Sequence, residues 1–473
     1  MSASTDGVER THWPAAATRP VWHDAATVAD TVARWQVQRA PAATKVDVAI
    51  VGGGLSGLWT AYYLSSLHPA AHIAVVEARR VGFGASGRNG GWCNGFFPLT
   101  ASELGEQFGA QAGLAAYHEG FRALDEIERV LHAEHIDCAW HRGGTIQSAS
   151  TALQAERLQA HVAAQHQAGL TAADLRWLPA ARVDEYLRLA ETYGAIYSPH
   201  CATVNPFALV LGLARVLRDR GVQIYEDSPA GSIADGVVSH AHGSLQANFV
   251  VHATEGYSNT FAQTKRRLAP LYSLMVATEP LSESVVSQLG WHGRATFNDG
   301  GQMIIYAQLT ADRRIAFGGR GAPYHFASRV NDRFDLDDAT HRRIVASIAK
   351  HFPAAAGARI THRWGGPLGV PRDWTPSVVI DRRAKYARLG GYVGDGVAAT
   401  NMFARMLVDA WHERDTALAK LPFLRHASPR WEVEPFRFIG INALLKLADS
   451  IDRYEVRRGK PPRVRTKIFE SLF

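Results

Sequence analysis

An apolar, strand-like run that ends in three closely spaced glycines constrains this chain more than any other feature. Residues 46–51 are rich in β-branched side chains, which favours a buried parallel strand. Gly52, Gly54 and Gly57 follow with GxGxxG spacing, and apolar residues then recur at the period of a helix. In such a unit the glycines allow a tight turn, close approach of a pyrophosphate and close helix–strand packing, and the helix N-terminus faces the anion. The sequence therefore predicts a Rossmann-like dinucleotide site at Gly52, Gly54, Leu55, Ser56 and Gly57.

A second strand pattern and an acidic residue complete this unit. Residues 72–76 resemble a strand, and Glu77 follows it, 20 residues after Gly57. A carboxylate at this position typically binds the adenosine ribose hydroxyls of a dinucleotide. Its negative charge also argues against a 2′-phosphate at the same place. A chance glycine turn explains this ordered set of elements poorly.

A glycine-rich loop begins only a few residues after Glu77. Residues 81–95 read VGFGASGRNGGWCNG, with six glycines, one arginine and no acid. A chain that binds NAD would usually continue here into an ordinary α/β repeat. The glycines let backbone N–H groups reach a cofactor, and Ser86, Arg88 and Asn89 add donors for phosphate or ring oxygens.

The motif GxGASGRNGG resembles the corresponding loop in flavoproteins of the D-amino-acid oxidase superfamily. Within that superfamily it most resembles the γ-glutamylputrescine oxidoreductase type of amine oxidase. The resemblance implies FAD as the cofactor, with this loop passing along the pyrophosphate and under the isoalloxazine ring. No histidine lies in residues 81–100 to form a link to the ring, so we expect non-covalent FAD, although Cys93 lies in the loop. The implied contacts in this segment are Ala78, Arg79, Ala85, Ser86, Gly87, Arg88, Asn89, Gly90 and Gly91.

A second strand–turn–helix unit lies near the C-terminal end. Residues 389–393 resemble a strand, Gly394-Asp395-Gly396 a tight turn, and residues 397–411 a helix. The resemblance implies that this unit meets the pyrimidine end of the flavin, where negative charge develops on reduction. It implies contacts from Gly394, Gly396 and Val397.

Two segments between these units also match the superfamily. A strand at residues 248–253 ends in Ala253 and Thr254, where such flavoproteins carry an Ala-Thr-Gly turn that Glu255 interrupts here. Upstream, Asn205 and Pro206 cap a helix, and the strand at residues 222–225 then brings Ala230 near the adenine side.

The fold class expected from these features is α/β, with a Rossmann-like FAD-binding domain interleaved with an α+β substrate domain built on a mixed sheet. Helical patterns at residues 101–135 and 151–167 and strand-like runs at 271–278, 301–307 and 314–319 would supply the substrate domain. The expected divisions are an N-terminal arm (1–45) anchored by its tryptophans, an FAD-binding domain (46–100, 205–255 and 360–415), a substrate domain (101–204 and 256–359) and a C-terminal helix with a basic tail (416–473).

The resemblance implies oxidation of a small amine or amino acid by hydride transfer to flavin N5, giving an imine that hydrolyses. Oxygen is the expected acceptor. Two alternatives stay open: a flavin dehydrogenase of the same fold that passes electrons to a quinone or carrier protein, and a non-catalytic flavin-bound relative. No second GxGxxG unit is found, which argues against a pyridine nucleotide site.

Three residues are candidates for the substrate site. Arg320 is either a charge near the flavin or a substrate anion, or a surface turn residue. Tyr306 and Trp364 are either aromatic residues of a pocket or ordinary core residues.

The composition excludes several classes of protein. A formal charge of +7 over 473 residues is too weak to indicate nucleic acid, and Cys93, Cys138 and Cys201 form no CxxC or Cys/His cluster, so we expect no disulfide framework and no metal. Without an apolar run of about 18 residues, we expect a soluble, cytoplasmic protein.

Residues 436–451 have apolar side chains at helical spacing before a basic stretch. This tail either docks on the domain or a neighbouring subunit, or lies at an anionic membrane surface.

Overall fold

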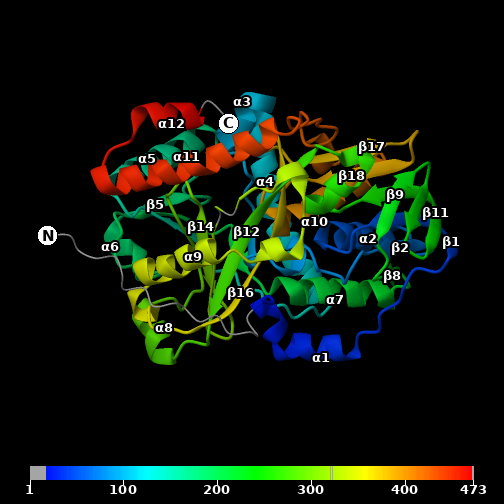
Figure 1. Cartoon of the computed structure of the whole chain (residues 1–473), viewed down its shortest axis with the longest axis horizontal. Helices are drawn as coiled ribbons and strands as arrows, with labels where there is room; N and C mark the ends of the chain where they lie inside the picture. Colours follow the sequence, from blue (N-terminus) through cyan, green and yellow to red (C-terminus); the bar gives the residue numbers. More distant parts are fainter. Residues whose placement is uncertain (1–17, 320, 322, 471–473) are drawn as a thin grey trace.

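Two sheets lie side by side in the computed structural model, which describes residues 18–319, 321 and 323–470 (Figure 1). The first has the order β17-β18-β11-β1-β2-β8, and its five strands from β18 to β8 are parallel. An antiparallel hairpin, β9 and β10, extends it beside β11. The bounds are β1 Ala43–Val51, β2 Ile73–Val76, β8 Gln223–Tyr225, β9 Ala230–Ala234, β10 Val237–His240, β11 Gly243–His252, β17 Ser377–Asp381 and β18 Tyr386–Gly390.

Helices cover the first sheet as a Rossmann-like layer requires. Helix α2 (Leu55–Leu67) packs against α10 (Gly396–Trp411) and α7 (Pro206–Asp219), and α10 also packs on α4 (Ala110–Ala133). The predicted cap of α7 is confirmed, because the side chain of Asn205 accepts hydrogen bonds from the backbone N–H groups of Phe207 (3.1 Å) and Ala208 (3.0 Å).

The second sheet is mixed and has the order β16-β12-β15-β14-β13-β4-β6-β5. Strands β13 and β4 pair in parallel, and the other neighbours are antiparallel. Helix α9 (Asp338–His351) packs on β12 and β15. The bounds are β4 Thr145–Ser148, β5 Arg176–Leu178, β6 Ala195–Ser198, β12 Leu268–Thr278, β13 Thr296–Asp299, β14 Ile305–Leu309, β15 Ile315–Gly319 and β16 Ile360–Pro371. The predicted α/β class, with a Rossmann-like part and a mixed sheet, is confirmed.

The position of β16 bears on the expected domain boundary at residue 360. That boundary assigns β16 to the FAD-binding domain, but β16 pairs with β12 from Leu268↔Pro371 to Thr278↔Ile360 and so lies in the second sheet. A boundary after Pro371 fits the pairing better. The other domain boundaries stay a prediction.

Shorter elements connect the two sheets. The predicted helix at residues 101–135 is two helices, α3 (Ala101–Phe108) and α4, because Gly109 between them has a φ of +98°. Strand β3 (Trp92–Asn94) pairs with β7 (Cys201–Thr203). The strand expected at 301–307 begins only at Ile305. The remaining helices are α5 Ala152–Gln167, α6 Ala180–Val183 and α8 Glu283–Leu289.

Both ends of the described chain pack on this body. The short 3-10 helix η1 (Val21–Asp24) and α1 (Ala26–Arg34) lie against α7. Near the C-terminus, α11 (Phe436–Arg458) buries Ile441, Ala448 and Ile451, and α12 (Arg463–Glu470) folds back beside it (Figure 1). Among the described helices, none combines the length and the apolar character needed to cross a bilayer.

Candidate functional site

The predicted glycine turn lies between β1 and α2. Gly52 has a φ of +114°, and a Cβ built on it would lie 2.4 Å from the carbonyl oxygen of Ala253 in the neighbouring strand. A Cβ on Gly57 would lie 2.0 Å from the carbonyl oxygen of Gly52. On Gly54 it would lie 2.8 Å from Ser86 Oγ. Gly52 therefore permits the left-handed turn, Gly54 the approach of the loop, and Gly57 the packing of α2 on β1.

A long cavity of about 410 Å³ opens beside this turn; we call it the β1–α2 cleft. Sixteen of the residues expected from the sequence line it: Gly52, Gly54, Leu55, Ser56, Glu77, Ala78, Arg79, Ala85, Ser86, Asn89, Ala230, Ala253, Thr254, Gly394, Gly396 and Val397. The other five do not: Gly57, Gly87 and Gly91 pack against backbone, and Arg88 and Gly90 line a neighbouring chamber.

The polar groups of the cleft fit a dinucleotide. The first N–H groups of α2 have no partner within the helix, and that of Leu55 donates to Ser86 Oγ at 2.8 Å. The Glu77 carboxylate accepts hydrogen bonds from the N–H groups of Gly53 (2.7 Å) and Arg79 (2.9 Å). Burial raises the pKa of Glu77, and these two hydrogen bonds oppose that shift. Together with the glycine cradle, these groups fit the pyrophosphate and ribose of FAD.

Glu255, which interrupts the expected Ala-Thr-Gly turn, joins the segment after β11 to the segment after β18. Its buried carboxylate accepts hydrogen bonds from the backbone N–H groups of Gly391 (2.9 Å) and Tyr392 (3.2 Å). Burial raises the pKa of Glu255 to about 7. The Tyr392 hydroxyl in turn lies 3.1 Å from Ser56 Oγ. Sequence reasoning treated Glu255 only as an interruption, whereas the structure gives it a fixed place between β11 and α10.

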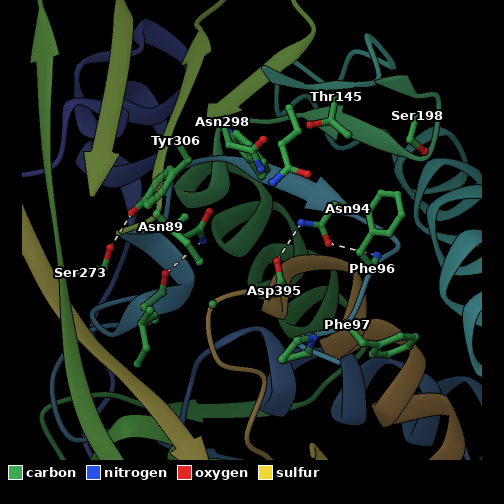
Figure 2. Close-up of a pocket in the computed structure, with 18 of the residues that line it drawn as sticks. Asn89, Asn94, Phe96, Phe97, Thr145, Ser198, Ser273, Asn298, Tyr306 and Asp395 are labelled. Carbon is green, nitrogen blue, oxygen red and sulfur yellow. Dashed lines mark hydrogen bonds between the residues drawn. The ribbon is translucent and has the colours of Figure 1, made fainter. Parts of the chain in front are cut away.

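A second cavity of about 360 Å³, the chamber, adjoins the cleft (Figure 2). Both cavities are lined by Ala85, Asn89, Leu368 and Gly394. Aromatic side chains of the chamber are Trp92, Phe96, Phe97, Tyr306 and Trp374, and its polar side chains include Asn94, Thr145, Gln147, Ser198, Asn298 and Asp395. Asn94 Nδ2 donates to Asp395 Oδ1 at 2.9 Å, which joins β3 to the turn before α10.

The structure describes two of the three candidate substrate residues, and of these two only Tyr306 lines the chamber. Tyr306 lines the chamber, and its hydroxyl lies 2.8 Å from Ser273 Oγ (Figure 2). Trp364 does not line it: the side chain is buried behind the loop, and its indole N–H donates to the carbonyl oxygen of Arg88 at 2.7 Å. Arg320 lies outside the described residues.

Arg88 is held by other residues of the chain. Its guanidinium pairs with the carboxylate of Asp335, donates to the carbonyl oxygen of Gly365 at 3.1 Å and lies 4.2 Å from the ring centre of Phe83. Burial raises the pKa of Asp335 to about 6, against the lowering effect of Arg88. The expectation that Arg88 donates to phosphate or ring oxygens stays a prediction, and a carboxylate more than 200 residues away holds the guanidinium.

Asn94, Phe96 and Asp395 are chamber residues that the sequence reasoning did not single out. Asn94 and Phe96 lie just past the glycine-rich loop, and Asp395 lies within the turn already identified, so proximity to these motifs was the available signal. Cys93 is fully buried and lines neither cavity, and burial raises the pKa of its thiol well above the usual range. Over the described part of the chain, no cluster of three or more His, Cys, Asp or Glu residues could hold a metal ion.

Similarity to known proteins agrees with this geometry. Residues 47–410 match the DAO family model, described as FAD dependent oxidoreductase. The γ-glutamylputrescine oxidoreductase of Escherichia coli (strain K12) is 28% identical over 409 residues, which cover 83% of this chain and 91% of that protein. The probable oxidoreductase OrdL of Haemophilus influenzae is 26% identical over 380 residues, which cover 77% of this chain and 82% of that protein.

A solved structure shares the fold. Glycine oxidase from Geobacillus kaustophilus superposes with a TM-score of 0.67 at 21% sequence identity, over 81% of this chain and 100% of that chain.

Proposed function

The chain belongs to the DAO family of FAD-dependent oxidoreductases, and we propose that it oxidises a small amine or amino acid. The observation that carries this proposal is the junction at which Ala85, Asn89, Leu368 and Gly394 line both the β1–α2 cleft and the chamber. When bound, FAD supplies a hydride acceptor, the ring atom N5. With FAD held by the residues of the cleft, the junction would let a substrate in the chamber reach that acceptor.

The residues of the cleft bind and orient the cofactor. The N-terminus of α2 and the glycine turn fit the pyrophosphate, and Glu77 fits the ribose hydroxyls. At the other end, α10 begins at Gly396, and its N-terminus favours negative charge beside it. This placement would stabilise negative charge on a bound flavin ring.

The residues of the chamber bind the substrate and exclude water. Trp92, Phe96 and Tyr306 offer apolar surface for the carbon chain, and the side-chain amides of Asn94 and Asn298 offer hydrogen bonds that orient polar groups. The amine reacts in its neutral form, because its lone pair must stabilise the cation left when hydride departs. The imine product then hydrolyses in water.

The names of the relatives support an amine or amino acid over other donors. One is a γ-glutamylputrescine oxidoreductase, another is the sarcosine oxidase β subunit of Arthrobacter sp, and the structural neighbour is a glycine oxidase. We infer non-covalent FAD, because the buried thiol of Cys93 lines neither cavity. We place the reaction in the cytoplasm, since three free cysteines fit a reducing compartment.

Oxygen is the proposed electron acceptor. The second candidate, a dehydrogenase that uses a membrane quinone or carrier protein, is favoured by the C-terminal surface. There Phe436 and Ile439 on α11 are 67% and 59% exposed. Arg457, Arg458 and Lys460 are exposed near its other end. Such a surface fits an anionic membrane or an acidic partner.

The decisive experiment is anaerobic reduction of the bound flavin, followed by stopped-flow absorbance. We expect bleaching by at least one member of a panel of polyamines, N-alkyl glycines, D-amino acids and aminophosphonates. Bleaching by a 2-hydroxy acid or NAD(P)H alone would disprove the amine assignment. Oxygen uptake and peroxide formation with the active amine would support the oxidase, and slow reoxidation by oxygen with fast reoxidation by a soluble quinone would support the dehydrogenase.

A further inference from the structure

The N-terminal segment reaches the back of the glycine-rich loop. Trp22 in η1 is buried, and its indole N–H donates to the carbonyl oxygen of Asn89 at 2.9 Å. The preceding carbonyl, that of Arg88, accepts the indole N–H of Trp364. The two indoles meet edge to face with ring centres 6.2 Å apart. Two tryptophans from distant segments therefore hold two consecutive carbonyls of the loop.

Beside these two carbonyls, within residues 88–91, one backbone donor stays available. The N–H of Asn89 donates to the carbonyl oxygen of Ala85 at 2.9 Å, and that of Gly91 donates to Asn89 Oδ1 at 2.8 Å. The carbonyl oxygen of Gly90 accepts from Gln308 Nε2 at 2.7 Å. Within residues 88–91, all of which the structure describes, the N–H of Gly90 alone has no acceptor.

The orientation of that donor follows from Trp22. In a trans peptide the C=O and N–H bonds point in opposite directions. Since the Asn89 carbonyl points to the Trp22 indole, the Gly90 N–H points away from it. Gly90 is buried and lines the chamber, next to Asn89 at the junction with the β1–α2 cleft.

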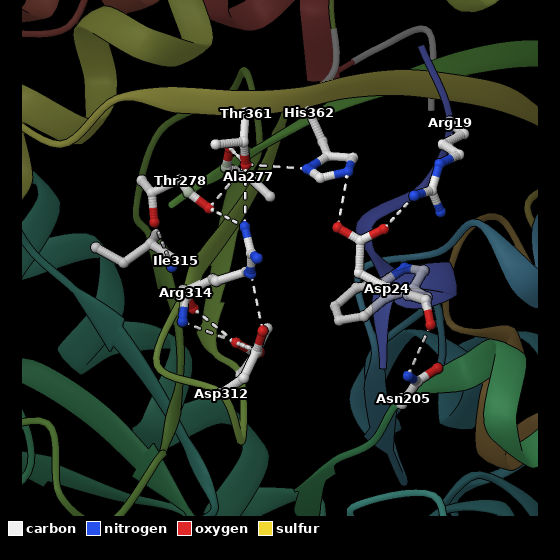
Figure 3. A network of polar contacts seen from close by, with 12 residues as sticks. Arg19, Asp24, Asn205, Ala277, Thr278, Asp312, Arg314, Ile315, Thr361 and His362 are labelled. Atoms are coloured by element: carbon white, nitrogen blue, oxygen red, sulfur yellow. Dashed lines mark hydrogen bonds and ion pairs between the residues drawn. The ribbon is translucent and has the colours of Figure 1, made fainter. Parts of the chain in front are cut away.

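A network of polar contacts holds Trp22 in place (Figure 3). The carbonyl oxygen of Trp22 accepts a hydrogen bond from Asn205 Nδ2 at 3.0 Å. Two residues further on, the Asp24 carboxylate contacts His362 Nε2 at 3.1 Å and Arg19 at 2.5 Å. His362 belongs to β16, so the network ties the N-terminal segment to the second sheet as well as to α7.

We propose that Trp22 is a positioning residue for the flavin. Its indole N–H sets the Asn89–Gly90 peptide so that the Gly90 N–H donates to an acceptor atom of the isoalloxazine ring. A donor aimed at the ring favours its reduced, more negative form over the oxidised form. Trp22 lies before the segment that matches the family model, residues 47–410. The inference uses FAD binding only, so it does not depend on the identity of the substrate.

The test compares Trp22→Phe, which keeps an aromatic ring but loses the N–H donor, with a matched control from the same segment. Trp35→Phe removes an indole N–H that donates to Glu226 Oε2 at 2.6 Å. Three readouts are taken: hydrogen exchange of residues 85–92 in the FAD-free protein, the dissociation constant of FAD, and the midpoint potential of the bound flavin by equilibration with a redox dye.

We expect Trp22→Phe to speed exchange in residues 85–92, to weaken FAD binding about fivefold, the effect of one net hydrogen bond, and to shift the potential to more negative values. Trp35→Phe should leave exchange and potential unchanged. A Trp22→Phe protein with wild-type exchange and potential would overturn the proposal. If Trp22→Phe does not fold, Asp24→Asn, which weakens the contact with His362, should shift the potential in the same direction, and an unchanged potential would equally overturn it.

Discussion

The hydroxyl of Ser86 accepts a hydrogen bond from the backbone N–H of Leu55 at 2.8 Å. Ser86 lies in the glycine-rich loop and Leu55 is the first residue of α2, so one bond joins the two segments that line the β1–α2 cleft. The geometry gives the serine of this glycine-rich loop a structural role. The Ser86 hydroxyl supplies an acceptor for the Leu55 N–H, which has no acceptor within the helix.

Ser86→Ala should therefore destabilise the protein and weaken cofactor binding. Loss of one such hydrogen bond costs about 1 kcal/mol, measured as the free energy of unfolding in urea without FAD. Ser86→Thr keeps the hydroxyl and serves as the control. Equal stability of the alanine and threonine variants would mean that the bond contributes nothing.

Gly54→Val should abolish FAD binding. The added Cβ would meet Ser86 Oγ at 2.8 Å, and the branched methyl groups would enter the cleft. The visible absorbance of bound flavin reports occupancy before and after FAD is added. Gly440→Val is the control, because a Cβ on Gly440 meets nothing within 4 Å beyond its chain neighbours and the backbone of its own helix, α11. Full occupancy in Gly54→Val would place the cofactor elsewhere.

Glu255 should make stability depend on pH around neutrality. Its pKa rises from 4.5 to about 7 in the folded protein, so folding favours the protonated carboxyl. Its contribution to stability is complete below pH 4.5 and is lost as the pH rises through 7, a change on the order of 3 kcal/mol. Urea unfolding of the FAD-free protein from about pH 4.5 to 8.5 measures it.

Glu255→Gln is the comparison for that experiment. The amide oxygen can still accept from the N–H groups of Gly391 and Tyr392, but the group carries no charge. We expect the variant to lose this part of the pH dependence and to exceed the wild type in stability at pH 8.5. Identical pH profiles for the two proteins would contradict the shifted pKa.

The rate of flavin reduction by an amine should rise with pH. Aliphatic amines have pKa values on the order of 10, and only the neutral form can donate hydride. We expect kcat/KM to increase between about pH 7 and 9, measured by stopped-flow reduction. A fluorinated analogue with a lower amine pKa should reach its plateau at lower pH, and a flat profile for both amines would refute the neutral-amine requirement.

Acid precipitation should release all of the FAD into the supernatant. Cys93 is fully buried and lines neither cavity, so its thiol has no access to the ring. Flavin that stays with the pellet in the wild type but not in Cys93→Ala would show a covalent link instead.

Local units were predictable from the sequence, and long-range partners were not. The β1–α2 turn and the turn before α10 each consist of a strand, glycines and a helix within about 20 residues, a length over which glycine spacing and apolar periodicity are informative. The same patterns could not show that Arg88 pairs with Asp335 or that β16 pairs with β12. These contacts depend on how distant segments meet in space.

Trp364 and Trp22 illustrate the same limit at the candidate site. A tryptophan in a strand-like run fits a pocket wall and a buried core equally well, and Trp364 packs behind the loop. The anchoring role expected for the tryptophans of the N-terminal arm agrees with the burial of Trp22, but its hydrogen bond to Asn89 spans 67 residues and leaves no local pattern.

The order of strands in the first sheet has a consequence for biosynthesis. Strand β1 pairs with β11 from Ala43↔Ser244 to Val51↔His252, and β11 pairs in turn with β18. On the ribosome, the edge of β1 that β11 covers stays open until about two hundred further residues have been made. Gly394, which lines the junction of the two cavities, emerges later still. The nascent chain thus completes its glycine turn early but cannot enclose a flavin ring until most of the protein has left the exit tunnel, which makes cofactor capture a late step of maturation.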